Sequence, residues 1–358
     1  MPIIKQLEIK KNRRVLITSD IHGNLERFKQ LLQHVQFSTD DVLIINGDLT
    51  EKGAASLETV RYTYELSKTH EIHIVQGNCE TLQYLDNPEH FEMLRNYINN
   101  RPQSLIHEML VAIGVAITPH MDMLAARTLL QSHYPEYIDF LGALPNIIET
   151  DAFTLVHAGL EQKSLTDQDV DLIQTMPYFG LVDTEFDKPV IVGHYPVCLY
   201  HKQTIDHKPI LDVIKNIYSI DGGNVIKDDG QLNVLIYEQG HFTVDYVDGF
   251  DYYSILNHQD GNKGTHISWM DREIEILDKK PEFIRVKQRS TGNEAWIHES
   301  FVDEEKNEVI DDVTDTVLQV SKHDLFHPLL KTSTGYYGKH NGEVGWYFGN
   351  LGGFCETH

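Results

Sequence analysis

Five short apolar runs in the first 200 residues each end in a small motif of Gly, Asp, Asn or His. The motifs are SDIHGN at 19–24, GD at 47–48, GN at 77–78, HAG at 157–159 and GH at 193–194. In α/β proteins the loops beyond the carboxyl ends of strands converge on ligand sites. This ordered recurrence therefore predicts a chain in which strands alternate with helices and the strand ends build one polar site.

The segments between these motifs have the periodicity of strands and helices. VLITSD at 15–20, LERFKQLLQHV at 25–35 and VLIINGD at 42–48 predict a strand, a helix and a strand. A second helix is expected over 56–68, and further strands over 71–78, 153–159, 188–195, 216–223 and 233–238. The predicted architecture is α/β with layered sheets.

Two parts of the chain depart from this rhythm. Residues 80–150 are rich in Asn, Tyr and His, and we expect an insertion that carries substrate-facing surface, with a helix over 90–99. After about residue 249 the sequence changes to short alternating segments separated by turns, which predicts small antiparallel β structure. We therefore expect a catalytic domain over 1–255 and a smaller all-β domain over 256–358.

The composition argues against some partners. With 54 acidic and 30 basic side chains, the formal net charge of -24 repels nucleic acid and anionic membranes, and no run of five Lys or Arg offsets it. The N-terminus has no apolar signal core, and the most lipid-like stretch, 109–118, is half of the roughly 20 residues that a spanning helix needs. Three widely spaced cysteines favour a reducing compartment. We expect a cytoplasmic protein that binds neither nucleic acid nor membrane.

The strand-end motifs supply a set of oxygen and nitrogen donors. The candidate metal ligands are Asp20, His22, Asp48, Asn78, His157 and His194. Such a mixed set suits manganese, iron or zinc better than a thiolate-preferring metal. Two such metals about 3.5–4 Å apart can share a bridging carboxylate and stabilise an in-line displacement at phosphorus. The pattern therefore predicts a two-metal site for phosphate chemistry.

The same residues resemble the metallophosphoesterase superfamily, in particular the bacterial PPP-type serine/threonine phosphatases. The family pattern runs Asp-x-His, Gly-Asp-x-x-Asp-Arg-Gly, Gly-Asn-His-Glu, His and His, and the similarity covers roughly residues 13–240. It implies a calcineurin-like fold, a layered β-sandwich flanked by helices. It also implies two divalent metal ions, with manganese or iron expected and zinc as an alternative.

The resemblance divides the six donors between the two metals. One metal would be held by Asp20, His22 and His194, and the other by Asn78 and His157, with Asp48 bridging both.

Two departures from the family pattern concern the substrate phosphate. In GDLTEKG, Glu51 and Lys52 stand where the family has Asp and Arg, so a point-charge ammonium replaces a bidentate guanidinium. In GNCE, Cys79 stands where the family has the His that protonates the leaving group with an acidic partner, while Glu80 retains the acid. The resemblance gives catalytic roles to Asp48, Lys52 and Glu80, and substrate binding to Lys52 and Asn78.

The change at Cys79 bears on the substrate. General-acid assistance raises the reaction rate about 10²–10⁴-fold and matters most when the leaving oxygen is basic. Its loss therefore favours substrates whose leaving group is a phenolate or a phosphate over those whose leaving group is a serine alkoxide. This holds unless another His or a water supplies the proton. We expect a phosphomonoesterase that acts on a phosphoprotein or an aryl phosphate through a hydroxide bridging the two metals.

Two alternatives stay open. A Gly-Asn-Cys-acidic motif also resembles the small phosphodiesterase branch of the superfamily, so a diadenosine polyphosphate hydrolase or a phosphodiesterase is the first alternative. A non-catalytic scaffold with the same fold is the second, although scaffolds usually lose ligands and here all six are present.

The C-terminal region, from EIEILDKK to WIHESFV, resembles a small bacterial Src-homology-type barrel. Such a domain would bind a peptide partner, mediate homodimerisation or pack on the catalytic domain. Trp296 and Trp346 are credible core residues of this region.

Overall fold

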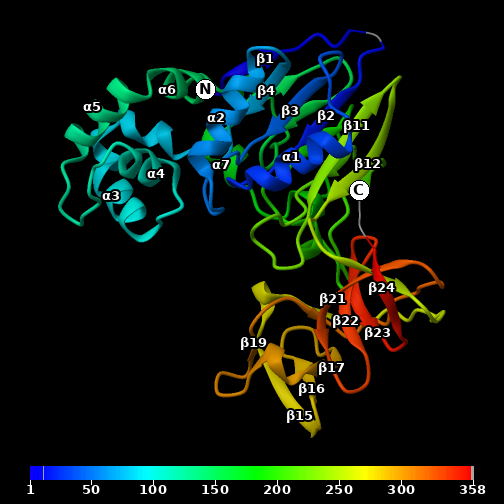
Figure 1. Cartoon of the computed structure of the whole chain (residues 1–358). Coiled ribbons are helices and arrows are strands. Elements are labelled where there is room, and N and C mark those ends of the chain that lie inside the picture. The colour runs from blue at the N-terminus through cyan, green and yellow to red at the C-terminus, as the bar shows by residue number, and fades with distance from the viewer. Residues whose placement is uncertain (11, 356–358) are drawn as a thin grey trace. The chain divides into compact units, whose positions relative to one another are not determined.

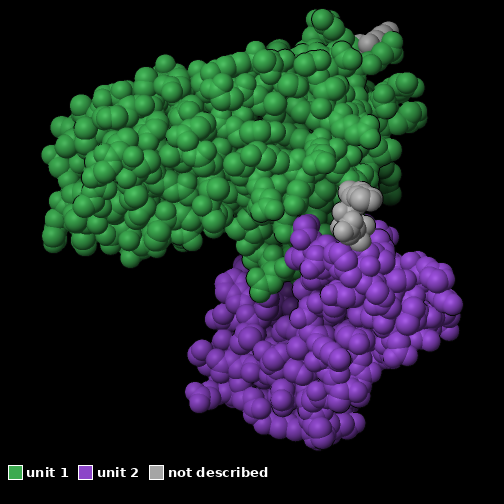
Figure 2. Space-filling model, in the orientation of Figure 1, with its two compact units in different colours: residues 1–196, 209–248 green, residues 197–208, 249–358 purple. Residues whose placement is uncertain are grey.

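The structure is a computed structural model of the 358-residue chain, and it describes residues 1–10 and 12–355. The chain divides into two compact units, which Figure 2 shows in different colours. Unit 1 contains residues 1–196 and 209–248, and unit 2 contains residues 197–208 and 249–358. Among the described residues, no helix is long and apolar enough to cross a membrane.

The first sheet of unit 1 has the strand order β12-β11-β2-β3-β4 (Figure 1). Its strands are β2 (Val15–Thr18), β3 (Val42–Asn46), β4 (Glu71–Val75), β11 (Leu232–Glu238) and β12 (His241–Val247). The first three run parallel, because helices connect them, and β11 and β12 add an antiparallel edge. The strands predicted over 15–20, 42–48, 71–78 and 233–238 are confirmed.

The second sheet of unit 1 has the order β1-β5-β6-β7-β10-β9. Its strands are β1 (Ile4–Gln6), β5 (Ile147–Glu149), β6 (Thr154–Val156), β7 (Val190–Val192), β9 (Ile210–Asp212) and β10 (Ile217–Ser219). β6, β7 and β10 are parallel to one another, so their carboxyl ends lie at one edge. The loops that follow β6 and β7 carry HAG and GH.

The two sheets pack face to face. Alternate side chains of a strand point to opposite faces of its sheet, so each strand can supply apolar side chains both to this interface and to the helices outside. Val15 and Ile17 of β2 belong to a buried cluster with Leu155 of β6 and Ile191 of β7. Leu16, between them in sequence, belongs instead to the cluster beneath the helices. Unit 1 is therefore a layered β-sandwich flanked by helices, as the sequence predicts.

The helices α1 (Leu25–His34) and α2 (Ser56–Ser67) form where the apolar periodicity predicts them. The side chain of Asn24 caps α1 by accepting a hydrogen bond from the backbone N–H of Arg27, and the helix buries Phe28 and Leu31. The loop between β6 and β7 contains α7 (Val170–Thr175) and the short helices η3 (Leu165–Asp167) and η4 (Phe179–Leu181).

The insertion over residues 80–150 is helical. Its elements are η1 (Thr81–Asp86), η2 (Pro88–His90), α3 (Phe91–Asn100), α4 (Leu105–Ala112), α5 (Met123–His133) and α6 (Pro135–Gly142). Figure 1 shows α3 to α6 gathered at one end of unit 1, beyond α2. The sequence predicts only α3. The other three α-helices begin at local signals, which are the Ser104 side chain that caps α4, the Asp122 side chain that caps α5 and Pro135 in the first turn of α6.

Unit 2 consists of short strands with three brief helices. Its strands are β8 (Ile205–Asp206), β13 (Tyr252–Ile255), β14 (His266–Ile267), β15 (Ile274–Lys280), β16 (Phe283–Gln288), β17 (Glu294–His298), β18 (Val302–Asp303), β19 (Glu308–Val309), β20 (Val313–Thr314), β21 (Leu325–Lys331), β22 (Tyr336–His340), β23 (Glu343–Tyr347) and β24 (Leu351–Cys355). The helices are η5 (Val197–Tyr200), η6 (Trp269–Asp271) and η7 (Glu299–Phe301).

The strands of unit 2 form a six-stranded sheet of order β24-β13-β21-β22-β23-β8, a three-stranded sheet β15-β16-β17 and two strand pairs. The segment that resembles a Src-homology-type barrel is the three-stranded sheet and the turns beside it. Trp346 lies in a buried cluster with Tyr337 and Val344. Trp296 is half-buried, and the Lys280 ammonium lies 4.2 Å from its ring centre.

The division between the units differs from the expected boundary at residues 255 and 256 in two places. Strand β13 belongs to unit 2, because it pairs with β21 and β24. Residues 197–208 also belong to unit 2, since β8 pairs with β23 and Cys198 and Ile205 are buried there. Local periodicity does not reveal either pairing, because the partner strands lie far along the chain.

Candidate metal centre

The structure brings the six predicted donors together from five loops. Asp20 and His22 follow β2, Asp48 follows β3, and Asn78 follows β4. His157 and His194 follow β6 and β7 of the other sheet. Backbone hydrogen bonds join the loops: Asp20 N–H donates to the Gly47 carbonyl at 3.1 Å, and His22 N–H donates to the Asp48 carbonyl at 2.9 Å.

Four of the six donors have left-handed backbone conformations. The φ angles are 55° at Asp20, 51° at His22, 52° at Asp48 and 66° at His194. Such conformations cost a non-glycine residue about 1–3 kcal/mol each and cluster at functional sites. Gly77, the residue before Asn78, has no space for a side chain, because a Cβ atom there would lie 2.2 Å from Asp48 Oδ1.

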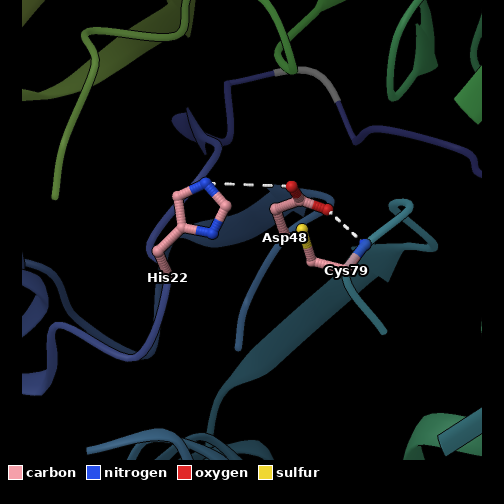
Figure 3. Close-up of side chains that lie close together, drawn as sticks. All are labelled: His22, Asp48 and Cys79. Atoms are coloured by element: carbon pink, nitrogen blue, oxygen red, sulfur yellow. Dashed lines mark hydrogen bonds and ion pairs between the residues drawn. The ribbon is translucent and has the colours of Figure 1, made fainter. Parts of the chain in front are cut away.

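The first group of donors surrounds His22. Its Nε2 atom lies 3.8 Å from Asp20 Oδ1 and 3.8 Å from Asp48 Oδ2, and all three side chains are buried. His22 Nδ1 lies 3.3 Å from the Thr50 carbonyl, so Nε2 is the ring atom that faces the two carboxylates. Figure 3 shows the ring facing the Asp48 carboxylate. These three side chains can bind one cation.

The second group of donors surrounds the amide oxygen of Asn78. Asn78 Oδ1 lies 3.1 Å from His157 Nε2 and 2.8 Å from His194 Nδ1. His157 Nε2 also lies 3.3 Å from Asp48 Oδ1, so Asp48 contacts both groups. His157 Nδ1 faces the Asn46 carbonyl at 2.9 Å, which fixes the ring in the way that metal-binding imidazoles are usually held.

This grouping differs from the expected division of ligands in one residue. The resemblance assigns His194 to the metal of Asp20 and His22, but its ring lies with Asn78 and His157. Only the backbone N–H of His194 contacts Asp20, at 3.0 Å to Oδ2. The left-handed backbone at His194 lets its amide and its ring face different donors.

The electrostatics of the six donors favour a cation. Burial raises the pKa of Asp20 well above its usual range, and the neighbouring carboxylates Asp221 and Asp48 add to this. Burial also acts to raise the pKa of Asp48, but His157 outweighs it and holds that pKa well below its usual range. Although burial opposes it, Asp48 raises the pKa of His157 to about 10. Asp48 and His157 therefore lie where positive charge is stabilised, which is what a divalent cation requires.

The other two imidazoles are neutral at pH 7. Burial and Lys52 lower the pKa of His22 to about 3, and burial and His157 lower that of His194 to about 4. Neutral imidazole is the metal-binding form of His. Two sets of three side chains have potential ligand atoms that all lie within 4.8 Å of one another inside the set. One set is Asp20, Asp48 and His157, and the other is His22, Asp48 and Cys79. Asp48 is common to both sets and to both groups of donors, although the sets divide the other donors differently, so Asp48 is the carboxylate that two divalent cations would share.

Cys79 and Glu80 occupy different positions relative to these donors. The backbone N–H of Cys79 donates to Asp48 Oδ1 at 2.9 Å, as Figure 3 shows, and burial raises the pKa of its thiol well above the usual range. Glu80 faces the backbone, because its carboxylate accepts from the N–H groups of Leu49 at 2.8 Å and Gly77 at 2.7 Å. The structure thus places Glu80 as a support for the loop of Asp48.

Lys52 lies at the edge of the donors, with its Nζ 3.4 Å from His22 Nε2. Burial acts to lower its pKa, but Cys79, Asp48 and Asp20 outweigh this and raise it, so the ammonium stays charged. A cavity of about 270 Å³ opens here. It is lined by Lys52, Asn78, Cys79, Thr81, Tyr84, Met93, Leu94, Tyr97 and Arg101.

Sequence reasoning missed Asp221, which follows β10. It is 1% exposed, and its Oδ1 accepts from the Gly223 N–H at 2.8 Å. Within the part of the chain that the structure describes, its Oδ2 has no hydrogen-bond partner. Burial raises its pKa to about 6. The signal was available, because IYSID ends a buried strand with an acidic residue as VLITSD does.

Comparison with known proteins agrees with this geometry. Residues 13–315 match the calcineurin-like phosphoesterase family. A symmetrical bis(5'-nucleosyl)-tetraphosphatase of Vibrio cholerae is 25% identical over an alignment of 271 residues, which covers 63% of this chain and 96% of that protein.

Two solved structures are also similar. A cold-active protein-tyrosine phosphatase of a Shewanella species has a TM-score of 0.39 and 15% identity, over 69% of this chain and 83% of its own. A serine/threonine phosphatase of Saccharomyces cerevisiae has a TM-score of 0.42 and 11% identity, over 73% of this chain and 87% of its own. With most of its length matched and the donors of five loops assembled, the chain belongs to the calcineurin-like phosphoesterase family.

Proposed function

We propose that this phosphoesterase hydrolyses a small phosphoanhydride, of the class of nucleoside polyphosphates, at a centre of two divalent cations. Asp20 and His22 would hold one cation, and Asn78, His157 and His194 the other, with Asp48 shared. The cations, when bound, polarise the phosphate and activate the attacking water. The oxygen and nitrogen donors favour manganese or iron, with zinc as the alternative.

The observation that carries this proposal is the lining of the cavity beside the donors. Its charged side chains are the cations Lys52 and Arg101, and none of the described carboxylates lines it, in a chain with a net charge of -24. Tyr84 and Tyr97 add aromatic surface, and the Arg101 guanidinium lies 5.0 Å from the centre of the Tyr97 ring. Such a cavity suits a ligand that combines negative charge with a flat ring.

The leaving group supports the same class of substrate. Burial raises the pKa of the Cys79 thiol, which makes it a weak general acid. Glu80 faces the backbone and is not part of the cavity. A nucleoside di- or triphosphate leaves as a weakly basic anion and needs little help from a general acid. The curated Vibrio cholerae relative, whose name gives a dinucleoside tetraphosphate as its substrate, supports this choice.

Hydrolysis of an aryl phosphomonoester is the second candidate. The cavity of about 270 Å³ is slightly smaller than the usual range of ligand pockets, about 300–1,000 Å³, so it would receive one aromatic ring with its phosphate. A phenolate, with a pKa of about 10, also leaves more readily than an alkoxide. A folded phosphoprotein could present a phosphotyrosine to the same cavity.

The test is a substrate panel with manganese-loaded protein. We expect kcat/KM for diadenosine tetraphosphate to exceed that for a phosphotyrosyl peptide and for a bis-aryl phosphodiester by at least tenfold, about 1.4 kcal/mol of transition-state stabilisation. Preference for the peptide would move the assignment to the aryl phosphomonoesterase. Absence of turnover on all three, with no metal bound, would favour the non-catalytic scaffold.

A further inference from the structure

Glu51 is a buried carboxylate that joins the loop of Asp48 to the helical insertion. It is 0% exposed. One oxygen accepts hydrogen bonds from Thr81 Oγ1 at 2.8 Å and from the Leu105 N–H at 3.1 Å, and the other accepts from Tyr97 Oη at 2.9 Å. The three donors belong to η1, α4 and α3 in turn. A single side chain thus holds three elements of the insertion.

Two of these three donors also line the cavity beside the metal donors, because Thr81 and Tyr97 are part of its wall. Tyr97 in turn packs against Arg101, which with Lys52 is one of the two cationic residues of that wall. The position of Glu51 therefore sets the position of the aromatic and cationic part of the cavity. Removing a partner from a buried carboxylate is costly, so the three hydrogen bonds specify one arrangement.

The backbone at Glu51 connects its side chain to the loops that carry the metal donors. Glu51 and Lys52 both have left-handed conformations, with φ of 71° and 65°. The N–H of Gly53 donates to the carbonyls of His22 and Glu51, each at 2.8 Å. The turn is fixed by these bonds, with Glu51 directed into the insertion and the Lys52 ammonium beside His22.

We infer that Glu51 is a positioning residue that holds the Tyr97 and Arg101 wall of the cavity in register with the metal donors, and that it thereby selects substrates by the portion beyond the reacting phosphate. This inference rests on the proposed function, since it requires the cavity to receive the substrate. Glu51 contacts no donor atom of the metal centre among the described residues, so its effect is on binding of the larger substrate.

Glu108 supplies a matched control in the same insertion. Its carboxylate accepts from the N–H groups of Ser56 at 3.2 Å and Leu57 at 2.7 Å and so joins α4 to the start of α2. Neither partner lines the cavity. Glu108→Gln therefore loosens the insertion without moving the wall that Glu51 holds.

The experiment compares diadenosine tetraphosphate with 4-nitrophenyl phosphate in Glu51→Gln, Tyr97→Phe, the double variant and Glu108→Gln. We expect Glu51→Gln and Tyr97→Phe each to raise KM for the dinucleotide about tenfold, with a clearly smaller rise for 4-nitrophenyl phosphate, whose single ring meets less of the wall. The double variant should be no worse than either single variant, because both substitutions disrupt the same hydrogen bond between Tyr97 and Glu51. Equal losses on both substrates, additive effects, or the same change in Glu108→Gln would overturn the inference.

Amide hydrogen exchange separates failure of this inference from failure of the proposed function. Glu51→Gln should speed exchange in η1 and α3 at least threefold, while Glu108→Gln should leave both segments unchanged. If wild-type protein does not hydrolyse the dinucleotide, the proposed substrate class fails, and the exchange result alone decides the role of Glu51. Unchanged exchange in η1 and α3 would contradict it.

Discussion

Asp48 is the residue on which both halves of the metal centre depend. Its carboxylate lies 3.8 Å from His22 Nε2 and 3.3 Å from His157 Nε2. It is 1% exposed, and its backbone is left-handed, so the fold holds a charged group in a strained and desolvated position. A divalent cation on each side would compensate for that burial.

Asp48→Asn should therefore abolish binding of both cations. The amide keeps the size of the side chain but removes the shared negative charge. We expect metal content to fall from two ions per chain to fewer than one, and hydrolysis to fall by at least 10³-fold, because the metals supply most of the catalysis. Elemental analysis after dialysis measures the first effect.

Asp40→Asn is a suitable control for this variant, since Asp40 is an exposed acidic residue on the same unit. It should retain both ions and full activity. Two tightly bound ions in Asp48→Asn, with activity preserved, would show that the shared carboxylate is placed wrongly.

At this scale the sequence predicts six side chains that the structure brings together, but it does not predict how they are grouped. Each donor directly follows a buried strand, a pattern that is visible without a structure. The grouping of His194 with Asn78 and His157 depends on a left-handed φ and on a hydrogen bond to Asp20, neither of which the sequence encodes visibly. The supporting role of Glu80 likewise depends on where its carboxylate turns.

At the scale of elements, acidic side chains join the helical insertion to the loop after β3 and to α2. Glu51 of that loop accepts from the Leu105 N–H of α4, and Glu108 of α4 accepts from the Leu57 N–H of α2. The strands and α1 follow from apolar periodicity, but α4 to α6 are ordered by packing on neighbours far along the chain. Tertiary contacts of this kind override weak local signals.

The attachment by Glu51 predicts a dependence of stability on pH. Burial raises the pKa of Glu51 to about 7, from the 4.5 of a free side chain. The folded state therefore binds the proton more tightly than the unfolded state. The stabilisation is complete below pH 4.5 and is lost as the pH rises through about 7.

Urea unfolding of metal-free wild type and Glu51→Gln from pH 5 to 8 measures this effect. The unfolding free energy of wild type should fall relative to that of Glu51→Gln by up to about 1.4 kcal/mol per pH unit and level off above neutrality. Glu58→Gln, an exposed change on α2, keeps Glu51, so the unfolding free energy of wild type relative to this variant should not change with pH in this way. A relative stability of wild type that rises with pH would contradict the assignment of this pKa.

At the scale of the whole molecule, the chain passes between its two units more often than the composition suggests. Residues 197–208 leave the sandwich of unit 1, supply β8 to the six-stranded sheet of unit 2 and return. The change in composition after residue 249 marks the second crossing but not the first. The first crossing depends on pairing between strands that are more than 130 residues apart, which no local pattern reveals.

Truncation tests this division of the chain. A protein that ends at residue 255 keeps Cys198, Ile205 and Ile255 but loses the strands that bury them. We expect it to aggregate and to bind a dye that reports exposed apolar surface. A second protein that ends at residue 248, with residues 197–208 replaced by a Gly-Ser linker of equal length, should stay monomeric. Equal solubility of both would contradict the assignment of residues 197–208 and 249–255 to unit 2.

The central claim is that side chains from five loops hold two divalent cations on either side of Asp48. Anomalous diffraction from crystals of the full chain grown with manganese tests it most directly. We predict two peaks about 3.5–4 Å apart, one beside Asp20 and His22 and the other beside Asn78, His157 and His194, with Asp48 contacting both. A single peak that does not touch Asp48, or no peak among these residues, would contradict it.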